Sequence, residues 1–103
     1  MVRHIVLFKF KETAGGKSKQ ENLAEAKARM EALGDVIPEL TRFQVYLGAQ
    51  GQAMGNYDYI LVSDFDSLGQ LEAYQKHPAH VAFGQFVKGL REPDGRCCID
   101  YEI

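Results

Sequence analysis

Val2-Arg-His-Ile-Val-Leu-Phe-Lys-Phe10, near the start of the chain, predicts a β-strand with apolar side chains on both faces. Side chains alternate between the two faces of a strand, so the even positions share one face: His4, Val6, Phe8 and Phe10. The opposite face carries Ile5 and Leu7 at its centre. A strand that is apolar on both faces belongs to a sheet that is covered on both sides.

A helix follows this strand and can supply one of the two covers. Ser18-Lys-Gln-Glu21 has the pattern of a capping box, in which two side chains satisfy free backbone N–H groups where a helix begins. Apolar residues then recur at helical spacing: Leu23, Ala26, Met30 and Leu33. Gly34 and Pro38 favour the end of this helix.

Two strands and a broken helix come next. Residues 41–47 and residues 57–65 both show the alternation that is typical of strands. Ser67 and Gln70 form a second capping-box pattern, which predicts a short helix to about Gln75. Pro78 suits the first position of a new helical segment, with His77 as its cap.

The remaining residues complete a known order of elements. The segment after Pro78 carries an apolar helical stripe of Phe83, Phe86, Val87 and Leu90. Pro93-Asp-Gly95 predicts a turn, and residues 96–103 predict a last strand. The order βαββαβ is the ferredoxin-like pattern. We therefore expect an α+β fold, a single domain over residues 1–103, with a four-stranded antiparallel sheet and the helices on one face.

The other face of this sheet needs a second cover. Its apolar side chains, such as Ile5 and Leu7, must be buried somewhere. A second copy of the chain, packed sheet against sheet, is the economical solution, so we expect a symmetric homodimer through the open sheet face.

The composition excludes some partners. The formal net charge is −2, which leaves no basic excess to neutralise the phosphates of a nucleic acid. No apolar run approaches the ~20 residues of a membrane span, and the N-terminus lacks the pattern of a secretory leader. Cys97 and Cys98 are adjacent and point to opposite faces of a strand, which favours free thiols in a reducing cytoplasm.

Tyr74-Gln-Lys-His77-Pro78-Ala-His80 concentrates the groups that can do chemistry. Histidine exchanges protons near neutral pH. His80 borders the apolar stripe of its helix, so it is either a core-edge histidine held by one hydrogen bond or a general base in a pocket. An unbroken helix would keep Tyr74 and His80 apart, but the break at Pro78 allows them to converge. His77 lies at the break, where a capping or solvent-facing role is expected.

His4 shares a strand face with core residues and should point into the same interior as His80. Its simpler interpretation is one hydrogen bond near the end of the strand. Two histidines are too few for a zinc site, since structural zinc has four protein ligands and catalytic zinc three. We therefore expect no metal.

Three segments together resemble the stress-responsive α/β-barrel (Dabb) family: His4-Ile-Val-Leu-Phe-Lys9-Phe10, the stretch from Tyr74 to Gly84, and Asp100-Tyr101. The resemblance spans essentially the whole chain and implies a dimeric α+β barrel. Most members have no assigned reaction, and a minority are plant-type polyketide cyclases that carry out an aldol condensation without metal or cofactor. The resemblance therefore implies that no cofactor is needed. In those enzymes the residue matching His80 is the base, the residue matching Tyr74 holds or polarises the substrate, and the residue matching His4 lines the pocket.

One departure from the cyclases concerns the first helix, where they have aromatic residues lining the pocket. This chain has no aromatic residue from Lys11 to Arg42, and Met30 and Lys27 would take their place. The predicted site therefore combines His80 and Tyr74 as catalytic residues with four substrate contacts, His4, Met30, Leu61 and His77.

Two main functions remain open from the sequence. The first is a dimer that binds a small organic molecule in a pocket between helices and sheet, with no reaction. The second is a cofactor-free enzyme in which His80 removes a proton α to a carbonyl and Tyr74 hydrogen-bonds the developing oxyanion. A cofactor-independent monooxygenase is a third alternative, which rests on fold analogy alone.

Overall fold

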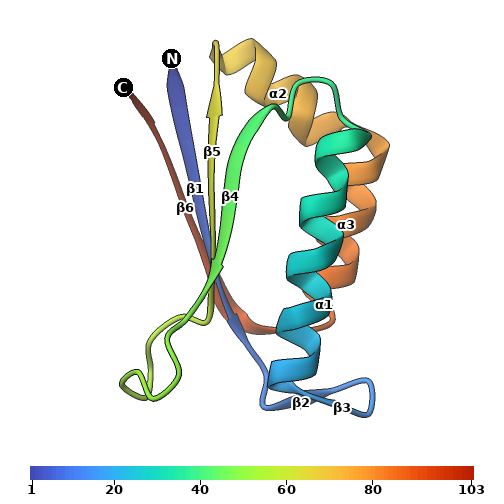
Figure 1. Cartoon of the computed structure of the whole chain (residues 1–103), viewed down its shortest axis with the longest axis vertical. Helices are drawn as coiled ribbons and strands as arrows, with labels where there is room; N and C mark the ends of the chain where they lie inside the picture. Colours follow the sequence, from blue (N-terminus) through green and yellow to red (C-terminus); the bar gives the residue numbers. More distant parts are fainter.

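The computed structural model describes all 103 residues as one sheet covered by helices on one face (Figure 1). The sheet is antiparallel with strand order β4-β5-β1-β6. Its strands are β1 (Val2–Phe10), β4 (Arg42–Leu47), β5 (Tyr59–Phe65) and β6 (Arg91–Glu102). The helices are α1 (Lys19–Ala32), α2 (Leu68–Lys76) and α3 (Pro78–Lys88). This arrangement confirms the predicted ferredoxin-like α+β fold.

The core lies between the helices and the inner face of the sheet. Every even position of β1 from Val2 to Phe10 is buried, and the odd positions between them are half-buried, as the alternation predicts. Leu23, Ala26 and Met30 meet this face from α1, and Phe83 and Val87 meet it from α3. The buried positions of β1 thus include His4, which is 2% exposed among apolar neighbours.

The caps of the helices form largely as predicted. Ser18 Oγ accepts from the backbone N–H of Glu21, and the Glu21 carboxylate accepts from the backbone N–H of Ser18, so the capping box of α1 is complete. At α2, Ser67 Oγ accepts from the N–H of Gln70. Helix α1 ends at Ala32 and continues as a 3₁₀ turn over Leu33–Asp35, which contains the predicted terminator Gly34.

The break between α2 and α3 lies where the sequence predicts it. His77 has an extended backbone (φ −61°, ψ 134°), and its Nδ1 accepts from the N–H of Ala79 at 3.1 Å. Pro78 begins α3, because its missing N–H needs no partner in the first turn. The chain therefore changes direction between Tyr74 and His80.

The turn predicted at 93–95 is wrong. Residues 91–102 form one continuous strand in which Arg91 pairs with Phe10, and the register shifts between Phe8 and Phe10. A Cβ on Gly95 would lie 2.5 Å from the carbonyl oxygen of Lys9, so the backbones approach where only glycine fits. The Pro-Asp-Gly sequence marks an irregularity within the strand, not its end.

A small hairpin between β1 and α1 was not predicted. Its strands are β2 (Thr13–Ala14) and β3 (Lys17–Ser18). Gly15 and Gly16 connect them with φ of 61° and 79°, the left-handed region that glycine adopts without strain.

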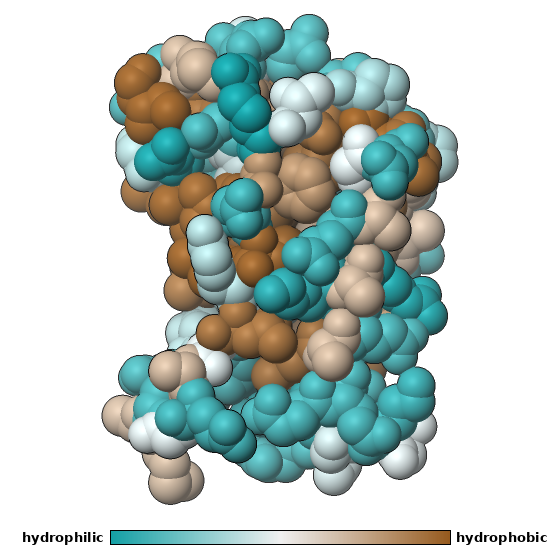
Figure 2. Space-filling model, viewed as in Figure 1, coloured by the Kyte–Doolittle hydropathy of each residue, from teal (hydrophilic) through white to brown (hydrophobic).

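No helix covers the outer face of the sheet. Large apolar side chains lie there at half-buried or exposed positions: Ile5, Leu7, Ile60, Val62 and Ile99. Ile99 is 59% exposed. Figure 2, which views the sheet from its β4 edge, shows hydrophobic surface at the middle height of the strands and mostly hydrophilic surface around the loops below. None of the helices has the length and apolar character needed to cross a membrane.

Candidate functional site

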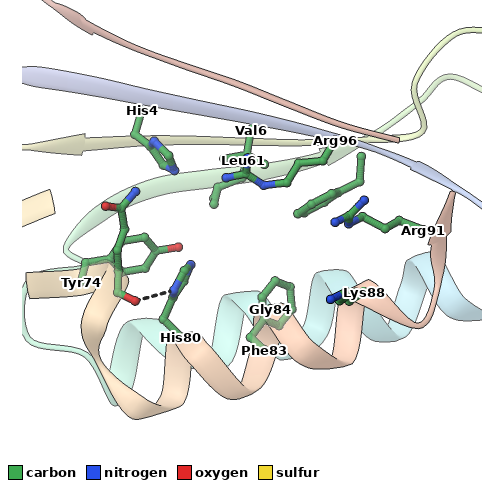
Figure 3. A pocket seen from close by; sticks show the side chains of 12 residues that line it. His4, Val6, Leu61, Tyr74, His80, Phe83, Gly84, Lys88, Arg91 and Arg96 are labelled. Atoms are coloured by element: carbon green, nitrogen blue, oxygen red, sulfur yellow. Dashed lines mark hydrogen bonds between the residues drawn. The ribbon is translucent and has the colours of Figure 1, made fainter. Parts of the chain in front are cut away.

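A cavity of about 150 Å³ opens between α3 and the inner face of the sheet. Side chains of β1, β5, β6, α2 and α3 line it (Figure 3). Val6, Phe8, Leu61 and Phe83 provide its apolar surface, while His4, Tyr74 and His80 lie together at one end. The cavity thus brings together polar groups from strand and helices that are seventy residues apart in the sequence.

His80 presents one ring nitrogen to this cavity. Its Nδ1 lies 3.0 Å from the backbone carbonyl oxygen of Gln75. A carbonyl oxygen only accepts, so Nδ1 carries the proton and Nε2 keeps its lone pair. Burial lowers the pKa of His80 and outweighs the bond to Gln75, which raises it. The charges of His4 and Arg96 act in the same direction as burial. A neutral imidazole with a free Nε2 is the form that a general base requires.

Tyr74 lies between the two histidines. Its ring centroid is 4.4 Å from that of His80 and 6.4 Å from that of His4. The side chain is fully buried, and its hydroxyl has no hydrogen-bond partner. Burial raises the pKa of this phenol, which therefore remains a protonated donor at neutral pH. Buried hydroxyls nearly always have partners, so this group is an unsatisfied donor beside the cavity.

His4 is held by a carboxylate on the neighbouring strand. Its Nδ1 donates to Oδ1 of Asp100 at 2.5 Å, and Cys98 Sγ lies 3.5 Å from the same nitrogen. The register pairs His4 directly with Asp100 across β1 and β6. This bond fixes the orientation of the imidazole at the wall of the cavity.

The same three residues are the set that offers metal-ligand atoms. The donor atoms of His4, Cys98 and Asp100 lie within 4.8 Å of one another. Nitrogen, sulfur and oxygen donors of this kind suit zinc, whose tetrahedral bonds of roughly 2.0–2.3 Å hold neighbouring ligand atoms roughly 3.3 Å or more apart. The separation of 2.5 Å between His4 and Asp100 is that of a hydrogen bond, so the pair is closer than two ligands of one ion.

The opposite end of the cavity is basic and was not predicted from the sequence. Lys88, Arg91 and Arg96 line it. Figure 3 shows Arg96 extending along the sheet past Val6 and Leu61, with Arg91 and Lys88 facing each other from β6 and α3. The alternation of the last strand could have indicated this end, because one face carries the polar residues Arg96, Cys98 and Asp100. These pair with Phe8, Val6 and His4 on the helix-facing side of β1.

The structure therefore brings together four of the six predicted site residues: His4, Leu61, Tyr74 and His80. Met30 and His77 lie elsewhere. Met30 is fully buried in the core, and His77 caps α3 through its own Nδ1. The helix α1, which the prediction placed beside the pocket, contributes no lining residue.

Comparisons with known proteins place this chain in a family. The family model described as the stress responsive A/B barrel domain, Dabb, matches residues 2–103. An uncharacterized protein of Streptomyces coelicolor is 33% identical over 82 residues, which cover 80% of this chain and 81% of that protein.

Solved structures agree with this match. A dimeric ferredoxin-like protein of unknown function from Bacteroides fragilis has a TM-score of 0.84 and 32% identity, covering 99% of this chain and 95% of that one. A dimeric ferredoxin-like protein of unknown function from Thermobifida fusca has a TM-score of 0.81 and 27% identity, covering 99% and 90%. The chain belongs to the Dabb family, the stress-responsive α/β-barrel domain.

Proposed function

We propose that this protein binds a small organic molecule in the cavity formed by His4, Tyr74 and His80. One observation carries the proposal: Tyr74 lines the cavity, and its hydroxyl is buried without a hydrogen-bond partner. A buried polar group without a partner costs about 1–3 kcal/mol, which a ligand oxygen or nitrogen at this position would recover. The apolar residues Val6, Leu61 and Phe83 would bury the rest of the ligand.

The geometry of His80 supports a second candidate, cofactor-free acid–base catalysis. Gln75 holds its Nδ1, and Figure 3 shows the second ring nitrogen on the side of the ring toward Tyr74. A carbonyl compound bound there would place its oxygen at Tyr74 and an acidic C–H at His80. Nε2 would take the proton, and the Tyr74 hydroxyl would stabilise the enolate oxygen as its charge develops.

Known enzymes share the fold, although their likeness shows the fold alone. Hydroxynitrile lyase from Passiflora edulis has a TM-score of 0.75 at 20% identity, covering 99% of this chain and 92% of that one. An antibiotic biosynthesis monooxygenase has a TM-score of 0.72 at 8% identity. These proteins make a reaction on this fold reasonable, and the proposal itself rests on Tyr74 and His80.

We also infer that two copies pair through the outer face of the sheet, where no helix covers the apolar side chains. The similar proteins from Bacteroides fragilis and Thermobifida fusca are described as dimeric, which supports this inference. The two cysteines are free thiols, which supports a reducing compartment such as the cytoplasm.

Ligand binding is tested with a library of small carbonyl compounds, screened by the chemical shifts of the side chains of His4, Tyr74 and His80. We expect compounds about the size of a single aromatic ring to change the chemical shifts of all three side chains together. Shifts confined to the loop at 48–56, or no shifts with any compound, would contradict a ligand site in this cavity.

Catalysis is tested separately by deuterium exchange at the acidic C–H of each bound ketone. We expect exchange faster than in buffer, and a loss of roughly 10²–10⁴-fold in His80→Ala. Exchange that is unchanged in His80→Ala would remove the acid–base candidate and leave the binding function in place.

A further inference from the structure

The cavity has uncompensated positive charge at the end remote from Tyr74. Lys88, Arg91 and Arg96 line it, whereas no aspartate or glutamate does. None of the three takes part in an ion pair. Arg91 Nη1 donates to the carbonyl oxygens of Glu92 and Pro93, each at 3.1 Å, which holds its guanidinium at the wall. Basic groups that face a cavity without an acidic partner favour an anionic occupant.

Both walls place the basic groups at a similar distance from the histidines. Lys88 follows His80 by eight residues on α3, a rise of about 12 Å. Arg96 pairs with Phe8, which follows His4 by four residues on β1, a rise of about 13 Å. Side chains as long as these reach back toward the middle, and the charge of Arg96 is felt at His80. The cavity therefore carries polar groups at both ends, and Arg96 extends from the basic end along the apolar wall at Val6 and Leu61 (Figure 3).

The size of the space limits the ligand. The cavity measures about 150 Å³, and an apolar cavity of that volume holds a molecule about the size of benzene. Its apolar wall comes from Val6, Leu61 and Phe83. A ring or short chain fits between the two polar ends, with room for one small charged group.

We propose that the ligand is a small organic carboxylate whose anionic group is held by Arg96, Arg91 and Lys88 and whose body reaches the Tyr74–His80 end. The inference rests on the proposed binding function and names the class of its ligand. The planar guanidinium of Arg96 matches two carboxylate oxygens. A keto acid would then present its carbonyl oxygen to Tyr74 and its acidic C–H to His80.

The experiment compares acids with neutral amides of the same shape: benzoate with benzamide, phenylacetate with phenylacetamide, and the short keto acid 4-oxopentanoate with its amide. Dissociation constants are measured by calorimetry at low and high salt. We expect at least one acid to bind about tenfold more tightly than its amide, the equivalent of one charge-assisted hydrogen bond. High salt should reduce this ratio, because Arg96 and Lys88 are exposed.

Substitutions test whether the basic residues of the cavity cause the preference for acids over amides. Arg96→Gln and Lys88→Gln should each reduce the acid-to-amide ratio, while Lys76→Gln, an exposed lysine on α2 outside the cavity, should leave it unchanged. Lys88 is exposed on its helix, so its substitution tests the proposal even if Arg96→Gln fails to fold.

The outcomes separate this inference from the binding function. Two results would overturn the anionic ligand and leave the cavity as a neutral binding site. One is that acids and amides bind equally, and the other is that both variants keep the acid-to-amide ratio of the wild type. Phenyl phosphate that binds more tightly than every carboxylate would overturn the choice of carboxylate. A protein that binds neither acids nor amides would contradict both proposals.

Discussion

The two buried tyrosine hydroxyls without partners, those of Tyr74 and Tyr59, offer a matched test at the scale of single residues. Only Tyr74 lines the cavity. Each Tyr→Phe change removes an unsatisfied buried group, so both variants should keep their free energy of unfolding or gain about 1 kcal/mol. Ligand affinity should fall only in Tyr74→Phe. Urea unfolding and calorimetry measure the two effects, and a ligand that binds Tyr74→Phe as well as the wild type would show that this hydroxyl has no role.

The protonation of His80 sets the direction in which stability and activity should change with pH. Burial lowers its pKa below the usual value of about 6.5. The folded protein then binds this proton less tightly than the unfolded chain does, so the contribution to stability is complete above about pH 6.5 and is lost as the pH falls. The acid limb of kcat/KM should likewise lie below pH 6.5. NMR titration of His80, assigned with His80→Gln, checks this prediction, which a midpoint at or above 6.5 would contradict.

At the scale of elements, two glycines should respond in opposite directions to alanine. Gly95 lies in β6, where an added Cβ would meet the Lys9 carbonyl at 2.5 Å. Gly95→Ala should therefore cost on the order of 1–3 kcal/mol, as other forced close contacts do. Gly84 lies within α3 with nothing within 4 Å of its added Cβ. Gly84→Ala should stabilise by about 0.5–1 kcal/mol, because alanine has less conformational freedom to lose.

Thermal and urea unfolding measure both changes. A Gly95→Ala variant with an unchanged free energy of unfolding would mean that β6 moves away from Lys9 without cost. A Gly84→Ala variant that is less stable than the wild type would contradict the open space around this position.

The break between α2 and α3 shows which part of the site could be predicted from the sequence of the two helices. Pro78 and His77 mark the start of a helix by local chemistry, namely a missing N–H and a side-chain acceptor. The break therefore followed from the sequence. The positions of Tyr74 and His80 relative to each other did not, because the angle between α2 and α3 depends on their packing against the sheet.

At the scale of the whole molecule, the outer sheet face predicts the assembly. Ile99, 59% exposed on β6, lies on this face. Ile99→Asp would bury a charge between the sheets of a dimer, so we expect it to convert the dimer to a monomer. Leu68→Asp is the matched control, since Leu68 is 61% exposed on α2, away from the sheet. It should leave the dimer intact.

Sedimentation velocity at micromolar concentration measures the assembly. A wild-type monomer, or an Ile99→Asp variant that remains dimeric, would contradict pairing through this face.

The sequence by itself determined the βαββαβ order of the main sheet and its helices, the capping box at Ser18 and Glu21, and the buried face of β1 that carries His4. Each of these follows from residues that are close together in the sequence, where capping and periodicity act directly. Only the tertiary structure decided that His4 meets Asp100, that Arg96 faces the cavity, and that Met30 does not. These depend on the register of β1 with β6 and on how the helices pack on the sheet. Hydrogen bonds and packing between distant segments set that register, and no local pattern encodes them.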